Sequence, residues 1–170
     1  MRVLLIHTFY KQKGGEDAVF KAEKELLKTK HTVDELLFDN HNLTAESKLK
    51  QVSNLFYNSS SYIKLEEKIK MFKPEVIHLH NLFYEASPSI LYAAQEYKVP
   101  VVITLHNYRL ICANALLLRE SKICELCVKK TIPLDGIKNK CFQDSALKTT
   151  LLVGATSYHK LAGTWRNKVS

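Results

Sequence analysis

Residues 2 to 6 read Arg-Val-Leu-Leu-Ile, a β-prone run that is apolar on both of its faces. A strand of this kind is typical of the centre of a parallel sheet, where helices cover both sides. The chain turns at Gly14 and Gly15, and residues 16–30 then carry apolar residues at helical spacing. Residues 31–39 form a second short apolar stretch. The first forty residues therefore predict a β-α-β unit.

The same alternation continues along the chain as far as residue 105. The next predicted elements are a helix at 62–72, a strand at 76–80, a helix at 88–97 and a strand at 100–105. Residues 40–61 are polar with one short helix, and Pro74 ends the helix before the third strand. The connections are long enough for helical crossovers. We therefore predict an α/β fold, a Rossmann-like open parallel sheet with helices on both faces.

The pattern changes over residues 107–144, which contain all four cysteines together with Pro133 and Gly136. This composition predicts an irregular excursion from the alternating fold. Residues 145–165 then resume as a helix with one apolar side. We expect one domain over residues 1–170 that carries this cysteine-rich excursion.

Composition and charge narrow the class of protein. The chain of 170 residues is 46% hydrophobic and 25% charged, which is ordinary for one globular core. Its formal charge of +8 comes mostly from lysines scattered along helices, which favours a membrane surface or phosphorylated ligands and predicts no nucleic-acid partner. The first ten residues are too short in their apolar run for a signal peptide, and no stretch reaches the roughly 18 apolar residues of a spanning helix. We expect a cytoplasmic protein.

Polar residues and histidines follow three of the four predicted strands. They are His7 after the first, His78, His80 and Asn81 at the third, and His106 and Asn107 at the fourth. Because parallel strands end at the same edge of a sheet, we expect these side chains to converge. One histidine at such a place is more often structural, but three strand ends together favour a site, since neutral imidazole acts as a base, a proton donor or a ligand contact.

Two alternatives to a simple ligand site remain at this edge. His78 and His80 alternate along one strand and point the same way, as a His-x-His metal site requires, but the sequence offers no obvious carboxylate partner. One of the two imidazoles could instead bond to a neighbouring backbone group.

Gly14 and Gly15 lie where a doubly wound fold brings backbone amides close to a ligand. No Gly-x-Gly-x-x-Gly or Walker pattern is present, and Glu16 and Asp17 would repel a phosphate placed on this helix terminus. A hydroxyl-rich sugar suits these two carboxylates better than a phosphate does. The alternative is a tight turn that only leads into the helix.

The four cysteines are the most specific local feature. They are Cys112, Cys124, Cys127 and Cys141. Cys124 and Cys127 have the two-residue spacing that lets adjacent sulfurs bind one ion, and four thiolates are what tetrahedral structural zinc requires. The isolated outer pair differs from a standard zinc ribbon, which has two such knuckles. Buried free thiols, and redox or disulfide chemistry, remain as alternatives.

Three segments of the chain carry a family resemblance. They are RVLLIHTFYKQKGGEDAVF at residues 2–20, KPEVIHLHNLFYEASPS at residues 73–89 and VPVVITLHNYRLIC at residues 99–112. Together they resemble glycosyltransferase family 4, in which a Gly-Gly loop follows the first strand and similar motifs end the third and fourth. The Cys-x-x-Cys motif and the closing HKLAGTW are similar to a subgroup that has this excursion.

The resemblance implies the amino-terminal half of a two-domain GT-B enzyme of polysaccharide biosynthesis. Such enzymes are usually retaining, are metal-independent in their chemistry and use a nucleotide-sugar donor. Their first domain holds the acceptor, here a glycan or a lipid-linked sugar, and their second domain holds the donor and a pair of glutamates. Glu67 and Glu75 have the interval of that pair, but Pro74 lies between them. We expect the second domain to be absent and this fragment to be inactive, since catalysis needs both lobes closed around the donor.

The resemblance also assigns roles to particular residues. Gly14, Gly15 and Glu16 match the loop that faces the interdomain cleft and are the predicted substrate-binding residues. His106 matches the histidine beside the transferred sugar and is the predicted catalytic residue. His80 and Asn81 are further substrate-binding candidates.

Two other functions remain open at this stage. The first is a non-catalytic module that binds a sugar or a polyanion at the same edge, and the second is a zinc-dependent or redox protein centred on the cysteines. The lysine-bearing helices are also compatible with peripheral association at the inner face of the membrane.

Overall fold

A computed structural model of the chain describes residues 1–10, 14–40 and 48–170. The chain forms two compact units. The first consists of Met1–His106 together with Arg166–Ser170, and the second is Asn107–Trp165. Among the described residues, no helix combines the length and the apolar character that crossing a membrane requires.

A four-stranded parallel sheet of order β2-β1-β3-β4 forms the centre of the first unit. Its strands are β1 (Arg2–Phe9), β2 (Thr32–Asp39), β3 (Val76–Leu79) and β4 (Val101–Ile103). β1 pairs with β2 along its whole length and with β3 from Val3 to Ile6, so it has a neighbour on each side. Its apolar residues from Val3 to Ile6 are accordingly buried. The predicted central strand is confirmed, and it is longer than predicted.

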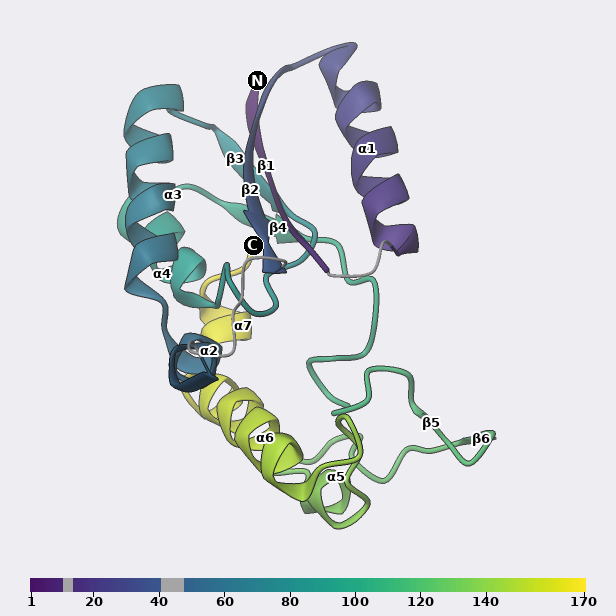
Figure 1. Cartoon of the computed structure of the whole chain (residues 1–170). Helices are drawn as coiled ribbons and strands as arrows, with labels where there is room; N and C mark the ends of the chain where they lie inside the picture. Colours follow the sequence, from purple (N-terminus) through teal and green to yellow (C-terminus); the bar gives the residue numbers. More distant parts are fainter. Residues whose placement is uncertain (11–13, 41–47) are drawn as a thin grey trace. The chain divides into compact units, whose positions relative to one another are not determined.

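Helices cover both faces of this sheet (Figure 1). Helix α1 (Gly15–Lys28) packs against β1 and β2 on one face. On the other face lie α3 (Ser59–Phe72), which contacts β2, and α4 (Ser89–Glu96), which packs against α3. The short helix α2 (Lys48–Phe56) precedes α3. The predicted α/β class, with a parallel sheet and helices on both faces, is confirmed.

Capping residues set the ends of α3. The helix begins at Ser59 rather than at the predicted residue 62, because the Asn58 side chain accepts a hydrogen bond from the Ser60 backbone N–H at 3.1 Å. It ends at Phe72, and the next residue, Lys73, adopts the left-handed conformation with φ of 51° and is followed by Pro74. A polar cap therefore extends the helix upstream of its first apolar residues.

The second unit begins at Asn107, where the predicted excursion begins, and continues to Trp165. It contains the two-residue strands β5 (Leu118–Arg119) and β6 (Lys122–Ile123), which pair antiparallel, and the helices α5 (Leu134–Lys138) and α6 (Ala146–Leu161). Helices α5 and α6 pack together. The unit therefore includes the long helix that the sequence analysis placed after the excursion.

The helix predicted over residues 145–165 is shorter in the structure. Helix α6 ends at Leu161, and a separate helix, α7 (Thr164–Asn167), follows it. Gly163 lies between them with φ of 64°, a left-handed conformation that interrupts a right-handed helix. The single long helix was therefore wrong over its last turn.

Candidate functional site

Four histidines meet at the carboxyl edge of the sheet. His7 lies on β1, His78 lies on β3, His80 follows β3, and His106 follows β4. The ring centroids of His78 and His80 are 4.4 Å apart, and those of His80 and His106 are 5.4 Å apart. The His7 and His80 centroids are separated by 6.3 Å. His80 is therefore the centre of the group.

His7 joins the end of β1 to the turn before α1. Because a carboxylate only accepts hydrogen bonds, His7 Nε2 donates to Asp17 Oδ1, at 2.8 Å. Asp17 Oδ2 accepts the Gly14 backbone N–H at 3.1 Å. The ring is fully buried and stacks on Phe20. Burial lowers the pKa of His7 more than Asp17 raises it, so the ring is neutral at pH 7.

His80 is almost fully buried, with an exposed fraction of 3%. Its Nδ1 lies 3.2 Å from His106 Nε2, and its Nε2 lies 3.2 Å from Glu23 Oε2. Burial, and then the charges of His78, His106 and His7, lower the pKa of His80 to about 3. The ring is therefore neutral at pH 7, and its contact with Glu23 is not an ion pair.

The segment after β4 supplies a partner to His78 and another to His80. Thr104 Oγ1 lies 2.8 Å from His78 Nε2, and His106 Nε2 contacts His80. Burial lowers the pKa of His78 despite the opposing effect of Glu23. His106 and His78 are both half-buried, so these two members of the group have access to solvent.

Gly14, at the start of α1, and His106 belong to the same edge. Contacts run from the Gly14 backbone through Asp17 to His7, from His7 to His80, and from His80 to His106. The charge of a protonated His106 also lowers the pKa of His7. Gly14 and His106, which the sequence analysis named, are therefore linked by a chain of contacts through three other residues.

Gly14 and Gly15 are both exposed at the amino end of α1. Gly14 has φ of −118° and ψ of 174°, extended backbone that any residue adopts. A Cβ atom on Gly15 would meet no atom of the described residues within 4 Å. Glu16 is half-buried beside them. The backbone does not require glycine at either position, and no described atom lies in contact with the place of a Cβ on Gly15.

The side chain of Asn81 makes its hydrogen bonds within the protein. Its Nδ2 donates to the Thr8 carbonyl at 3.0 Å, and its Oδ1 accepts the Phe83 backbone N–H at 3.1 Å and the Tyr10 hydroxyl at 3.4 Å. This predicted substrate-binding residue therefore holds the loop after β3 against the end of β1.

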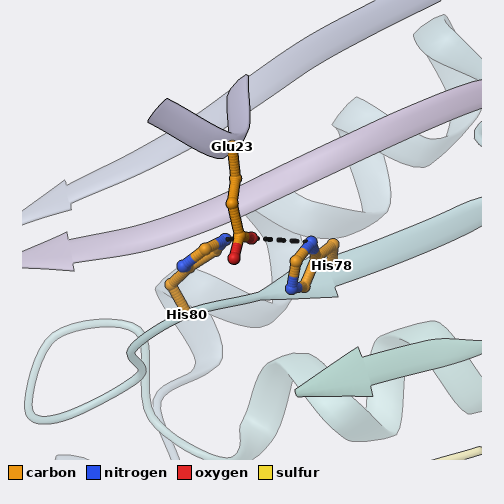
Figure 2. Close-up of side chains that lie close together, drawn as sticks. All are labelled: Glu23, His78 and His80. Atoms are coloured by element: carbon orange, nitrogen blue, oxygen red, sulfur yellow. Dashed lines mark ion pairs between the residues drawn. The ribbon is translucent and has the colours of Figure 1, made fainter. Parts of the chain in front are cut away.

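Glu23 is the residue of this edge that the sequence analysis missed. Its Oε2 lies 3.2 Å from His80 Nε2 and 3.6 Å from His78 Nδ1, and Figure 2 shows it reaching from α1 towards both rings. The available signal was helical spacing, since Glu23 is three residues after the buried Phe20 and so lies near the same side of the helix. Glu23 supplies the carboxylate partner that the sequence analysis did not identify for His78 and His80.

The four cysteines lie in the second unit as free thiols, and no two of them form a disulfide. Burial raises the pKa of Cys141, and the charges of Cys127, Cys112 and Cys124 raise it further, so the four sulfurs share one region. Among the described residues, the ligand atoms that lie within 4.8 Å of one another in a group of three belong to Glu23, His78 and His80. Structural zinc at the cysteines stays a prediction.

No family model, curated protein or solved structure matches the chain. The geometry itself therefore defines the class, an α/β protein whose parallel sheet carries a cluster of histidines at its carboxyl edge.

Proposed function

We propose that the chain is the acceptor-binding half of a retaining GT-B glycosyltransferase, and that a glycan or lipid-linked acceptor binds at the carboxyl edge of the sheet. The observation that supports this most is the chain of contacts from the Gly14 turn to His106. Ligands of open α/β sheets bind at this edge, where strand order brings loops from several crossovers together.

The chemistry of the edge favours hydroxyl groups over phosphates. Burial lowers the pKa values of His7, His78 and His80, so these rings are neutral at pH 7. Neutral rings supply no positive charge that would attract a phosphate. The carboxylates of Asp17 and Glu23 lie at the same edge and would repel a phosphate.

We assign the contact with the transferred sugar to His106. Its Nε2 is held by His80 Nδ1 at 3.2 Å, which fixes the orientation of the ring and leaves Nδ1 for a substrate hydroxyl. The ring is half-buried, so it is both oriented by the protein and accessible. The nucleotide-sugar donor is assigned to a second domain of GT-B type.

The test is a transfer assay in a protein that joins this chain to a nucleotide-sugar-binding domain, with radiolabelled UDP- and GDP-sugars as donors. His106→Ala should lower turnover at least about 100-fold, the usual effect of losing a positioned acid or base, while donor binding is kept. His31→Ala, just before β2 at the opposite edge, is the matched control and should leave turnover unchanged. Unchanged turnover in His106→Ala would remove this histidine from the site.

A binding measurement separates catalysis from recognition. If the chain binds glycans at this edge and no donor ever yields transfer, the non-catalytic sugar-binding module is the correct alternative. If neither binding nor transfer involves the edge, both proposals are wrong.

A further inference from the structure

Three atoms of metal-ligand type converge between α1 and β3 (Figure 2). Glu23 Oε2 lies 3.2 Å from His80 Nε2 and 3.6 Å from His78 Nδ1. Zinc bonds to nitrogen and oxygen of about 2.0–2.1 Å, at tetrahedral angles, place neighbouring ligand atoms about 3.3–3.4 Å apart. The distance from Glu23 Oε2 to His80 Nε2 is slightly shorter than this spacing, and the distance to His78 Nδ1 is slightly longer.

The second nitrogen of each imidazole is already held. His78 Nε2 contacts Thr104 Oγ1 at 2.8 Å, and His80 Nδ1 contacts His106 Nε2 at 3.2 Å. When these nitrogens donate their protons, the lone pairs of His78 Nδ1 and His80 Nε2 both face the Glu23 carboxylate. Histidines that bind metals have this arrangement, because a neighbouring acceptor fixes the tautomer and the orientation of the ring.

Two of the three atoms are left without a hydrogen bond. Within the described part of the chain, His80 Nε2 and Glu23 Oε2 are both buried and neither makes a hydrogen bond, although they face each other at 3.2 Å. Buried polar atoms without a partner are rare in folded proteins and call for an explanation such as an ion. A cation at this point would satisfy both atoms and remove the repulsion between their lone pairs.

We propose that Glu23, His78 and His80 bind one divalent transition-metal ion, for which Zn²⁺ is the best match. Two imidazole nitrogens and one carboxylate oxygen form a known zinc ligand set, and they leave a fourth position for water or a ligand hydroxyl. The site does not depend on the proposed transferase function, since its ligands are defined without any substrate.

Metal binding would also determine which ring nitrogen of the neighbouring His106 carries the proton. With Nε2 bound to the ion, His80 keeps its proton on Nδ1 and donates it to His106 Nε2. His106 then carries its own proton on Nδ1. The ion would thereby select one tautomer of the half-buried histidine without touching it.

The first experiment titrates the metal-free full chain with Co²⁺ and follows visible absorption. We expect one ion to bind through nitrogen and oxygen ligands, and a separate ion at the cysteines would be distinguished by its sulfur-to-metal charge-transfer band. Glu23→Gln and His78→Gln should each weaken this binding at least about tenfold, and Glu25→Gln should not. Glu25 lies on the same helix with its side chain 71% exposed, which makes it a matched control.

The second experiment uses the unmodified protein, so that it does not depend on how the variants fold. Imidazole ¹⁵N resonances are recorded as Zn²⁺ is added, and those of His78 Nδ1 and His80 Nε2 should move while those of His31 stay. If His80 Nε2 carries a proton donated to Glu23 and does not respond to Zn²⁺, the metal site is wrong. No sugar is present, so this result is independent of acceptor binding.

Discussion

At the scale of single residues, His80 makes the fold sensitive to acid. The unfolded chain protonates this histidine near its ordinary pKa of 6.5, whereas burial keeps the folded pKa at about 3. Between these values the unfolded state binds more protons, so the free energy of unfolding falls as the pH falls. His7 and His78, whose pKa values burial also lowers, act in the same direction.

Urea unfolding at a series of pH values, with a chelator present, tests this. We expect the free energy of unfolding to decrease as the pH is lowered from about 6.5, by as much as about 1.4 kcal/mol per pH unit for each such histidine. His80→Gln should make the dependence shallower. An unchanged slope in this variant would show that folding does not lower the pKa of His80.

Asp17 connects the imidazole of His7 to the backbone at Gly14. Its side chain accepts hydrogen bonds from the His7 Nε2–H and from the Gly14 backbone N–H. Asp17→Ala should destabilise the protein by about 1–3 kcal/mol, because it leaves the buried imidazole N–H unsatisfied. Thermal or urea unfolding measures the loss, with Glu25→Ala on the exposed side of α1 as the control. Equal stability of Asp17→Ala and the unmodified protein would contradict this role.

Substitutions at Gly15 test whether glycine is needed there for folding or for ligand binding. Since a Cβ there meets no atom of the described residues within 4 Å, Gly15→Ala should fold normally, with a stability within about 1 kcal/mol of the original. Gly15→Leu should also fold but should weaken glycan binding at least about tenfold, because its larger side chain would occupy the place of the acceptor beside this residue. If Gly15→Leu binds as well as Gly15→Ala, the acceptor does not approach this turn.

At the scale of elements, apolar runs were sufficient to predict the sheet and its helices. The burial of Val3 to Ile6 and the presence of a parallel sheet follow from continuous apolar runs separated by amphipathic stretches, whereas the order of the strands comes from the structure. The helix ends depended on single residues, such as the capping Asn58 and the left-handed Gly163. The periodic spacing of apolar residues does not show the effect of such residues.

The histidines of the candidate site were predictable from the sequence, whereas Glu23 on α1 was not. The histidines lie at or after the ends of strands, and the topology of a parallel sheet brings those ends together. Glu23 was not predictable in the same way, because an acidic residue in mid-helix is usually a solvated one. Its role depends on which side of α1 packs over the ends of β1 and β3, and only the structure shows that. The same holds for Asn81, whose amide is used by the backbone of β1.

At the scale of the whole molecule, the two units should respond differently to loss of metal. Structural zinc at the cysteines, if present, stabilises residues 107–165, whereas an ion at Glu23 stabilises the packing of α1 on the sheet. Hydrogen exchange with and without a chelator should therefore show faster exchange in both regions and little change in α3. Faster exchange around α1 alone would remove zinc from the cysteines, and unchanged exchange everywhere would remove both ions.

The central claim is that one edge of the sheet, from the Gly14 turn to His106, receives a sugar acceptor. The most direct measurement is a ¹H–¹⁵N NMR titration of the full chain with the oligosaccharides that it retains on a glycan array. We predict that the largest shifts fall on Gly14, Gly15, His80 and His106. Shifts confined to residues 107–165, or to the amino-terminal edge beside His31, would contradict the account.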